Sequence, residues 1–286
     1  MSKIQVAVCI SGQSRFWKTG LESFYNFFDT STANYKIFAH TWDINTSKTT
    51  QFQEKIDTNL LRDNMFKYYH NLEDLTIDNY EQVSCKLFAP NDRDTDIPLP
   101  TDRSVDGAEK AVFQRRPTGW LSLFYSSMVS NSLKQQYEIN NNMHFDVVVK
   151  TRFDNWYHRD NGKFVNWTNQ MSHREIYSNL MIFKEEYYLP GINDTFYYGN
   201  SETMDIVDSF FNCYQNADFF KMLKVNGRDP ALKLVGPNVL LYKWIVQKNI
   251  MVKQQRYYKW GVIRQKVADA KWPDDDDNVI QAFLEG

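Results

Sequence analysis

The sequence predicts an α/β fold in which helices pack on a mostly parallel central sheet. Two short apolar runs, Ile4–Ile10 and Phe145–Val149, are suited to strands that are buried on both faces. Polar or charged residues follow each run at once, as is typical where a strand ends at a ligand site. Segments with helical spacing of apolar residues lie between the predicted strands, and 286 residues are enough for one large domain.

The first part of the chain alternates between strands and helices. In order, the predicted elements are a strand at Ile4–Ile10, a helix at Phe16–Asp29, a strand at Tyr35–Ala39, an irregular helix at Thr50–Leu75, a strand around Val83–Phe88, a long helix at Thr118–Glu138 and the strand at Phe145–Val149. Pro117 suits the first turn of the long helix. Ser122, Ser126, Ser127 and Ser130 are small enough to let this helix pack closely on the sheet.

The second part of the chain has a different order of predicted elements. Its predicted elements are strands at Glu175–Phe183 and Phe196–Tyr198, helices at Glu202–Tyr214 and Pro237–Lys248, and a strand region at Met251–Arg264. No internal repeat or low-complexity linker divides the chain, so we expect a single domain.

The composition excludes several classes of protein. A formal net charge of −2 offers no general attraction for nucleic acid or for anionic membranes. The three cysteines, Cys9, Cys85 and Cys213, show neither a disulfide framework nor a zinc pattern, and they fit a reducing compartment such as the cytoplasm. No apolar run approaches the roughly 20 residues of a membrane-spanning helix, and the start of the sequence lacks the pattern of a signal peptide.

A small polar turn follows the first predicted strand. Ser11, Gly12, Gln13 and Arg15 form this turn, and a glycine at such a place lets the backbone approach a nucleotide. Neither the G-x-G-x-x-G pattern of dinucleotide-binding folds nor the G-x-x-x-x-G-K-[ST] pattern of P-loop proteins is present. The turn therefore either approaches a nucleotide in a site of another kind or is a turn that touches no ligand.

Polar residues also end the second and the central strand. The second strand runs into His40 and Asp43; His40 is either a ligand or a structural histidine, and Asp43 either accepts from a uracil N3–H or caps a helix. The central strand runs into Arg152 and Asp154, which share one face of an extended chain. A carboxylate beside a guanidinium suits a metal-bound diphosphate, and the alternative is a solvated Arg–Asp pair.

Four short motifs, taken in order, resemble a known family. The segments SGQSRF, IFAHTWD, VVVKTRFD and DTFYYGN follow the pattern S-G-Q-x-R, H-T-W, T-R-x-D and D-x-F-x-x-G of bacterial and viral polysaccharide glycosyltransferases, across roughly residues 4 to 215. The resemblance implies a GT-A-like (Rossmann-like) three-layer sandwich in one domain. Residues 1–155 would form the nucleotide-sugar-binding half, and residues 156–286 the acceptor-side half.

The resemblance also implies a chemistry. The expected donor is a nucleotide sugar, in first place a UDP-sugar, with Mn²⁺ or Mg²⁺, and the expected acceptor is a glycan or a lipid-linked molecule in the cytoplasm, of the host cell if the protein is viral. The implied nucleotide-binding residues are Ser11, Gly12, Gln13, Arg15, His40, Asp43 and Arg152, the metal ligand is Asp154, and the sugar is bordered by Trp156 and Gly199. For the catalytic base, Asp194 is the first candidate and Asp229 the second, and the alternative for Asp194 is a turn-forming role after Gly191.

The sequence departs from the family pattern at two places. Position 152 is arginine where a strict D-x-D motif has aspartate, and the start of the Pro237 helix, where many inverting members carry an acid, reads Val235–Asn238 without a carboxylate. Two other functions therefore remain open. One is a sugar nucleotidyltransferase, and the other is a non-catalytic protein that binds a sugar or nucleotide on a degenerate transferase fold.

Overall fold

The computed structural model describes residues 3–28, 33–46, 53–87, 107–158, 173–183, 189–214, 237–254 and 259–262. The strands of the main sheet are β1 (Ile4–Ser11), β2 (Ala33–Trp42), β5 (Leu72–Asp78), β6 (Val147–Thr151), β8 (Glu175–Phe183), β9 (Leu189–Gly199) and β10 (Met251–Gln254). Two short antiparallel pairs are β3 (Ile44–Thr46) with β4 (Gln53–Lys55), and β7 (Asn155–His158) with β11 (Lys259–Val262). The helices are α1 (Trp17–Phe27), α2 (Thr58–Tyr68), α3 (Tyr80–Leu87), α4 (Gly107–Asn141), α5 (Ser201–Asp208), α6 (Phe210–Tyr214) and α8 (Pro237–Gln247).

The main sheet is mostly parallel, as the sequence predicts. Its strand order is β10-β8-β9-β6-β1-β2-β5. Strand β9 runs antiparallel to both of its neighbours, and the other paired strands are parallel. Strands from both parts of the chain thus belong to one sheet, which is compatible with a Rossmann-like sandwich. No helix in the described ranges is long and apolar enough to cross a membrane.

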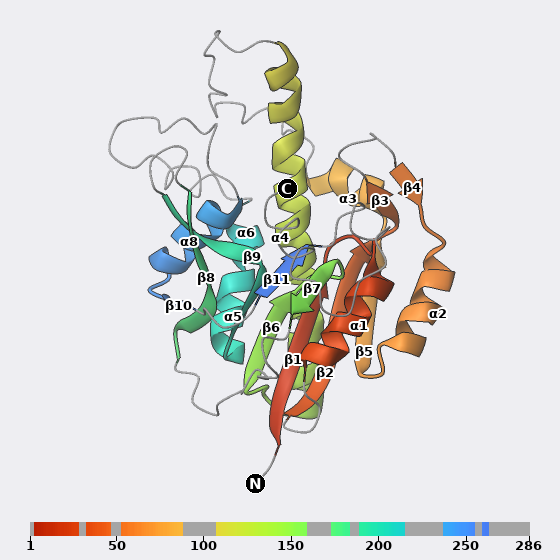
Figure 1. Ribbon diagram of the computed structural model, residues 1–286, viewed down its shortest axis with the longest axis vertical. Coiled ribbons are helices and arrows are strands. Elements are labelled where there is room, and N and C mark those ends of the chain that lie inside the picture. The colour runs from red at the N-terminus through yellow and green to blue at the C-terminus, as the bar shows by residue number, and fades with distance from the viewer. Residues whose placement is uncertain are drawn as a thin grey trace.

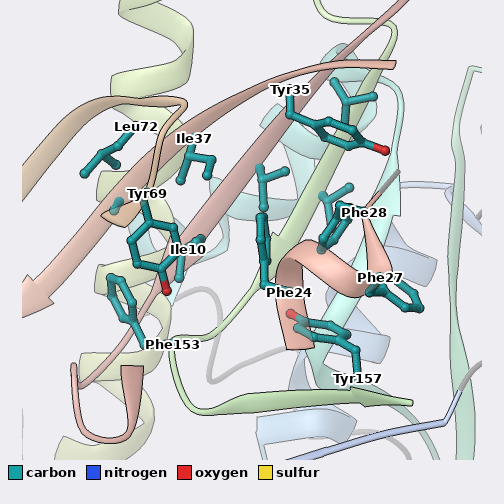
Figure 2. Close-up of a cluster of buried hydrophobic side chains, with 14 of the residues drawn as sticks. Ile10, Phe24, Phe27, Phe28, Tyr35, Ile37, Tyr69, Leu72, Phe153 and Tyr157 are labelled. Atoms are coloured by element: carbon teal, nitrogen blue, oxygen red, sulfur yellow. The ribbon is translucent and has the colours of Figure 1, made fainter. Parts of the chain in front are cut away.

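Helices cover both faces of the sheet, which gives three layers (Figure 1). Aromatic residues of α1 pack on one face, where Phe24, Phe27 and the following Phe28 belong to one buried cluster with aliphatic residues of β1, β2 and β6 (Figure 2). Helices α4, α5, α6 and α8 cover the other face. Burial of each large apolar side chain contributes roughly 1.5–3 kcal/mol, so these two clusters are the main source of stability.

The segment between residues 50 and 88 differs from the prediction. Leu72–Leu75, expected to be the end of an irregular helix, begins the edge strand Leu72–Asp78, and the expected strand at Val83–Phe88 falls largely within helix α3. Strand β5 pairs with β2, and this tertiary pairing outweighs the local pattern. Helix α4 also begins at Gly107, so Pro117 lies inside the helix rather than in its first turn.

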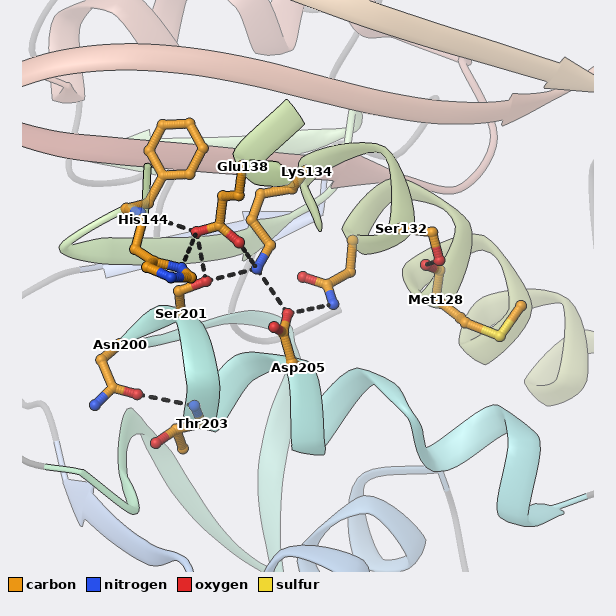
Figure 3. A network of polar contacts seen from close by, with 11 residues as sticks. Met128, Ser132, Lys134, Glu138, His144, Asn200, Ser201, Thr203 and Asp205 are labelled. Carbon is orange, nitrogen blue, oxygen red and sulfur yellow. Dashed lines mark hydrogen bonds and ion pairs between the residues drawn. The ribbon is translucent and has the colours of Figure 1, made fainter. Parts of the chain in front are cut away.

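Helix α4 carries the predicted row of small residues, and Ser122, Ser126, Ser127 and Ser130 are all buried. One turn beyond this row, the buried amino group of Lys134 donates to Glu138, Ser201 and Asp205 at 2.9, 2.6 and 2.7 Å (Figure 3).

Glu138 in turn accepts from the hydroxyl of Ser201 at 2.7 Å. All three charged groups of this network, those of Lys134, Glu138 and Asp205, have partners, so it joins α4 to α5 without an isolated buried ion.

Candidate functional site

The candidate site lies where neighbouring strands of the sheet lead in opposite directions. Strands β1 and β6 are adjacent and parallel, and Ile10 pairs with Thr151 at their carboxyl ends. From β1 the chain continues to β2 on one side, whereas from β6 it continues to β8 and β9 on the other side. Ligands of open α/β sheets bind just outside the carboxyl ends at such a switch point. The segments that follow β1 and β6 therefore mark the expected place.

Three charged residues of these two segments meet at this point. Arg152 holds the Asp154 carboxylate with two parallel hydrogen bonds, from Nε to Oδ1 at 2.7 Å and from Nη2 to Oδ2 at 2.8 Å. Arg15, from the turn after β1, donates its Nε–H to Asp154 Oδ2 at 3.2 Å. The structure thus brings the predicted residues Arg15, Arg152 and Asp154 into one cluster, although 139 positions separate Arg15 from Asp154.

Hydrogen bonds to Ser126 and His40 hold the turn that carries Arg15 in place. Gly12 has a φ of +113°, which favours glycine, and its N–H donates to the Ser126 hydroxyl at 2.9 Å and to the His40 carbonyl at 3.2 Å. The Ser126 oxygen lies 2.6 Å from His40 Nδ1, and His40 Nε2 lies 3.2 Å from an Asp78 carboxylate oxygen.

Burial lowers the pKa of His40 despite the Asp78 carboxylate beside it, so the ring is neutral at pH 7. In that form Nε2–H donates to Asp78, and Nδ1 accepts from the Ser126 hydroxyl. Since His40 is fully buried and both nitrogens are engaged, its contribution to nucleotide binding would pass through the Gly12 turn.

Asp43 is a buried helix-capping residue. Its two carboxylate oxygens accept from the Asn79 side-chain amide at 2.7 Å and from the Tyr80 backbone N–H at 2.9 Å. These contacts fix the start of α3, as in the capping alternative, although the helix is not the one that follows directly. A uracil ring would have to share this carboxylate with Asn79 and Tyr80.

Asp194 lies in a bulge of β9. Residues 193–196 of β9 face the single residue 179 of β8, because Ile192 pairs with Leu180 and Tyr197 with Ser178. The side-chain amide of Asn238, in the first turn of α8, donates to Asp194 Oδ1 at 3.1 Å. Burial raises the pKa of Asp194, while the nearby charge of Arg152 and the Asn238 hydrogen bond lower it in part. Arg152, which follows β6, and Asp194, which lies in β9, therefore interact electrostatically.

Lys150 adds a positive charge beneath the cluster. It lies on β6, is 1% exposed, and its amino group has no hydrogen-bond partner among the described residues. Burial lowers the pKa of Lys150 to about 8, and the Asp208 carboxylate opposes this shift. Asp208 accepts from the hydroxyls of Ser127 at 2.7 Å and Tyr197 at 2.9 Å, and burial raises its pKa to about 6.

In the described part of the chain, the remaining predicted residues are not part of the cluster formed by Arg15, Arg152 and Asp154. Ser11 is buried at the end of β1, and Gln13 is half-buried in the turn. Gly199 lies inside the sheet between β6 and β8, where an added Cβ would come within 2.9 Å of the Glu175 carbonyl oxygen, so the structure does not bring it to the cluster. Trp156 is part of β7, but its side chain lies outside the described part, as does the whole of Asp229.

The sequence does not predict the roles that Asn238, Ser126, Asp78 and Lys150 have in the site. The motif pattern marks Asn238 only as the place of a missing acid. Ser126 and Asp78, which support the turn through His40, carry no motif of their own. Lys150 had a signal, since a lysine after three valines in a central strand is a rare buried charge.

The residues of the cluster do not fit a divalent cation as they stand. Mn²⁺ and Mg²⁺ prefer six oxygen ligands, including at least one carboxylate oxygen that is free to bind. Both Asp154 oxygens already accept from guanidinium groups. In the described part of the chain, no group of three or more His, Cys, Asp or Glu side chains is placed to hold a metal.

Comparison with known proteins adds no further assignment. No model of a known protein family matches the sequence, and no curated protein matches it. The functional argument therefore depends on the motifs and on the geometry of the site.

Proposed function

We propose that this protein is a glycosyltransferase that transfers a sugar from a nucleotide-diphosphate donor, in first place a UDP-sugar, to a glycan or lipid-linked acceptor. One observation carries the proposal. Two guanidinium groups and a separate half-buried carboxylate, those of Arg15, Arg152 and Asp194, gather at the carboxyl ends of β1 and β6. Guanidinium groups suit the diphosphate of such a donor, and a carboxylate suits the acceptor hydroxyl.

The transfer requires two kinds of chemical assistance. The acceptor oxygen forms a bond to the anomeric carbon, the bond from this carbon to the diphosphate oxygen breaks, and its electron pair leaves with the diphosphate. Arg152 and Arg15 would stabilise the negative charge that gathers on the leaving group. Asp194 would take the proton of the acceptor hydroxyl, and its raised pKa makes it a stronger base than an exposed aspartate.

The pairing of Asp194 with Asn238 supports this role. The motif resemblance places an acid at the start of the helix that begins at Pro237, and the sequence has Asn238 there. In space, Asn238 lies against Asp194, so β9 supplies a carboxylate next to the expected position. Asn238 would then orient the base rather than act as the base. The sheet, with its single antiparallel strand beside β6, is compatible with a GT-A-like fold.

A transfer assay with the full-length chain tests the proposal. Melting temperatures measured with UDP, GDP, ADP and CMP identify the base, because a ligand that binds only the folded state raises the melting temperature. UDP-sugars are then incubated with glycan and lipid-linked acceptors, and the release of UDP is measured. Release of pyrophosphate instead would indicate a sugar nucleotidyltransferase, and the absence of any nucleotide-induced shift would contradict the proposal.

A second candidate function is non-catalytic binding of a nucleotide sugar. It is favoured by the Asp154 carboxylate, both oxygens of which accept from arginines, and by the lack, in the described ranges, of a group of three or more side chains that could hold a metal. Under this alternative, UDP would raise the melting temperature, yet no donor would be hydrolysed or transferred with any acceptor.

A further inference from the structure

The charged cluster presents its positive groups outward. The Asp154 side chain is 1% exposed, whereas the side chains of Arg152 and Arg15 are 19% and 31% exposed. A ligand that approaches this end of the sheet therefore meets guanidinium groups before it meets the carboxylate. Guanidinium groups donate paired hydrogen bonds to phosphate oxygens, so this order of charges favours an anion over a cation.

A divalent cation at Asp154 would have to replace existing contacts. Oδ1 accepts from Arg152 at 2.7 Å, and Oδ2 accepts from Arg152 at 2.8 Å and from Arg15 at 3.2 Å. A metal ion bound to either oxygen would lie close to two positive side chains and would be repelled by both. Asp194 is the other carboxylate described at this end of the sheet, and it already accepts from Asn238, so the site offers little to offset this repulsion.

Lys150 adds a third positive charge from below. It is buried two residues before Arg152 on β6, and its amino group has no hydrogen-bond partner among the described residues. A buried charge without a hydrogen bond destabilises a folded protein, and the charge of the Asp208 carboxylate offsets only part of this cost for Lys150. A bound anion at the strand ends would offset this cost, which gives Lys150 a reason to be there.

We infer that Arg15 and Arg152 bind the diphosphate of the nucleotide donor directly, without a divalent cation, and that Asp154 is the anchor that orients both guanidinium groups. This inference rests on the proposed function, because it concerns the leaving group of the same transfer. Asp154 is then a positioning residue beneath the ligand, and Lys150 supports the anion electrostatically from within the sheet.

Titration calorimetry of UDP with the full-length protein tests the inference. One series contains excess EDTA, and the other contains Mn²⁺. We expect dissociation constants that agree within about twofold. Binding that requires Mn²⁺ would overturn the inference and leave the proposed function standing. If neither UDP nor any other nucleoside diphosphate binds in either buffer, the proposed function and the inference both fail.

Variants identify the groups that hold the anion. In EDTA, Arg152→Gln should weaken UDP binding by about tenfold or more, and Arg152→Lys should weaken it less, because a point charge replaces a planar fork. Arg62→Gln, an exposed arginine on α2, is the matched control and should leave the affinity unchanged. Equal affinities of Arg152→Gln and the wild type would contradict the inference.

Asp154→Asn separates an anchor from a metal ligand. Loss of an anchor should weaken UDP binding by a similar factor with EDTA and with Mn²⁺. Loss of a metal ligand should weaken it only with Mn²⁺, which would overturn the inference. The melting temperature of each variant is recorded first, and the wild-type comparison in the two buffers decides the matter even if Asp154→Asn does not fold.

Discussion

At the scale of single residues, the proposed chemistry depends on Asp194 and on two neighbours from distant parts of the chain. Arg152 follows β6, and Asn238 lies in the first turn of α8, 44 positions after Asp194. Asn238 holds one carboxylate oxygen, and the charge of Arg152 keeps the buried group from an even higher pKa. Arg152 and Asn238 would thus set both the orientation and the basicity of the Asp194 carboxylate, which accepts the proton.

Replacement of Asp194 should separate turnover from donor binding. Asp194→Asn keeps the shape but removes the base, so we expect transfer to fall on the order of 10²–10⁴-fold, the usual share of general base catalysis. UDP affinity should change little, because the base acts on the acceptor. The measurement pairs the rate of UDP release with calorimetry on the same preparation.

Asn238→Ala is the matched variant for the orienting role. It should lower turnover less than Asp194→Asn and should shift the pH profile of the rate, since a hydrogen bond to the carboxylate is lost. A fall in UDP affinity and melting temperature at unchanged turnover for Asp194→Asn would instead make Asp194 a purely structural residue of the bulge.

The sequence predicts part of this residue cluster and not the rest, for a physical reason. Arg15, Arg152 and Asp154 follow buried strands directly, and parallel strands place their carboxyl ends at one edge of the sheet. The contact of Asn238 with Asp194 depends on how α8 packs against β9 and on a bulge in β9. Neither feature has a local pattern. The sequence also leaves two roles for Asp43, because one carboxylate can accept from a ligand or from the N–H groups at the start of a helix.

At the scale of elements, the close approach of α1 to the segment after β6 positions the cluster. Gly20 of α1 faces the backbone of Phe153 and Asn155, and a Cβ atom added at Gly20 would lie 2.2 Å from the Phe153 carbonyl oxygen. Only glycine allows this contact. Because Phe153 stands between Arg152 and Asp154, the packing of α1 controls where the two charged side chains point.

A methyl group at Gly20 should therefore disturb stability and site together. We expect Gly20→Ala to lower the free energy of unfolding by about 1–3 kcal/mol through overpacking, although alanine favours helices. UDP binding should weaken as the segment after β6 shifts. Thr19→Ala, one position earlier in α1, is the control and should change neither property by much. Urea unfolding and calorimetry of both variants provide the test, and an unperturbed Gly20→Ala variant would refute the steric argument.

Edge elements are where sequence reasoning about this fold is weakest. The central strands β1 (IQVAVCIS) and β6 (VVVKT) each contain an apolar run rich in valine, and their positions follow from this pattern. Strand β5, with the sequence LEDLTID, lies at the edge of the sheet and carries charges that also suit a helix. Its pairing with β2, together with a register shift next to Phe38, decides its conformation.

At the scale of the whole molecule, buried ionisable groups make stability depend on pH. The pKa of Lys150 is about 8 in the folded protein and 10.5 ordinarily. Between these values the unfolded chain binds a proton that the folded chain has released, so the free energy of unfolding rises with pH. Asp208, Cys9, Arg152 and Asp194 surround this lysine. Asp208 acts oppositely at lower pH: its folded pKa of about 6 makes stability fall as pH rises from 3.8 to 6.

The contribution of Lys150 can be isolated with Lys150→Met. Below pH 8 the variant should be at least as stable as the wild type, because it buries no unpartnered charge. As pH rises from 8 to 10, the wild type should gain up to about 3 kcal/mol relative to the variant. Urea unfolding at pH 7 and pH 10 measures this change. If the free energies of unfolding of the two proteins change equally with pH, Lys150 is not the group that titrates.

The Lys134 network also has a consequence for synthesis on the ribosome. Lys134 is made well before Ser201 and Asp205, two of the groups that hold its buried charge. Until β9 emerges, β6 also lacks the partner on its second edge. At roughly 5–20 residues per second, the interval between β6 and Asp205 lasts about 3–10 s. For that time the growing chain exposes an unfinished strand edge, the situation in which nascent proteins need chaperones.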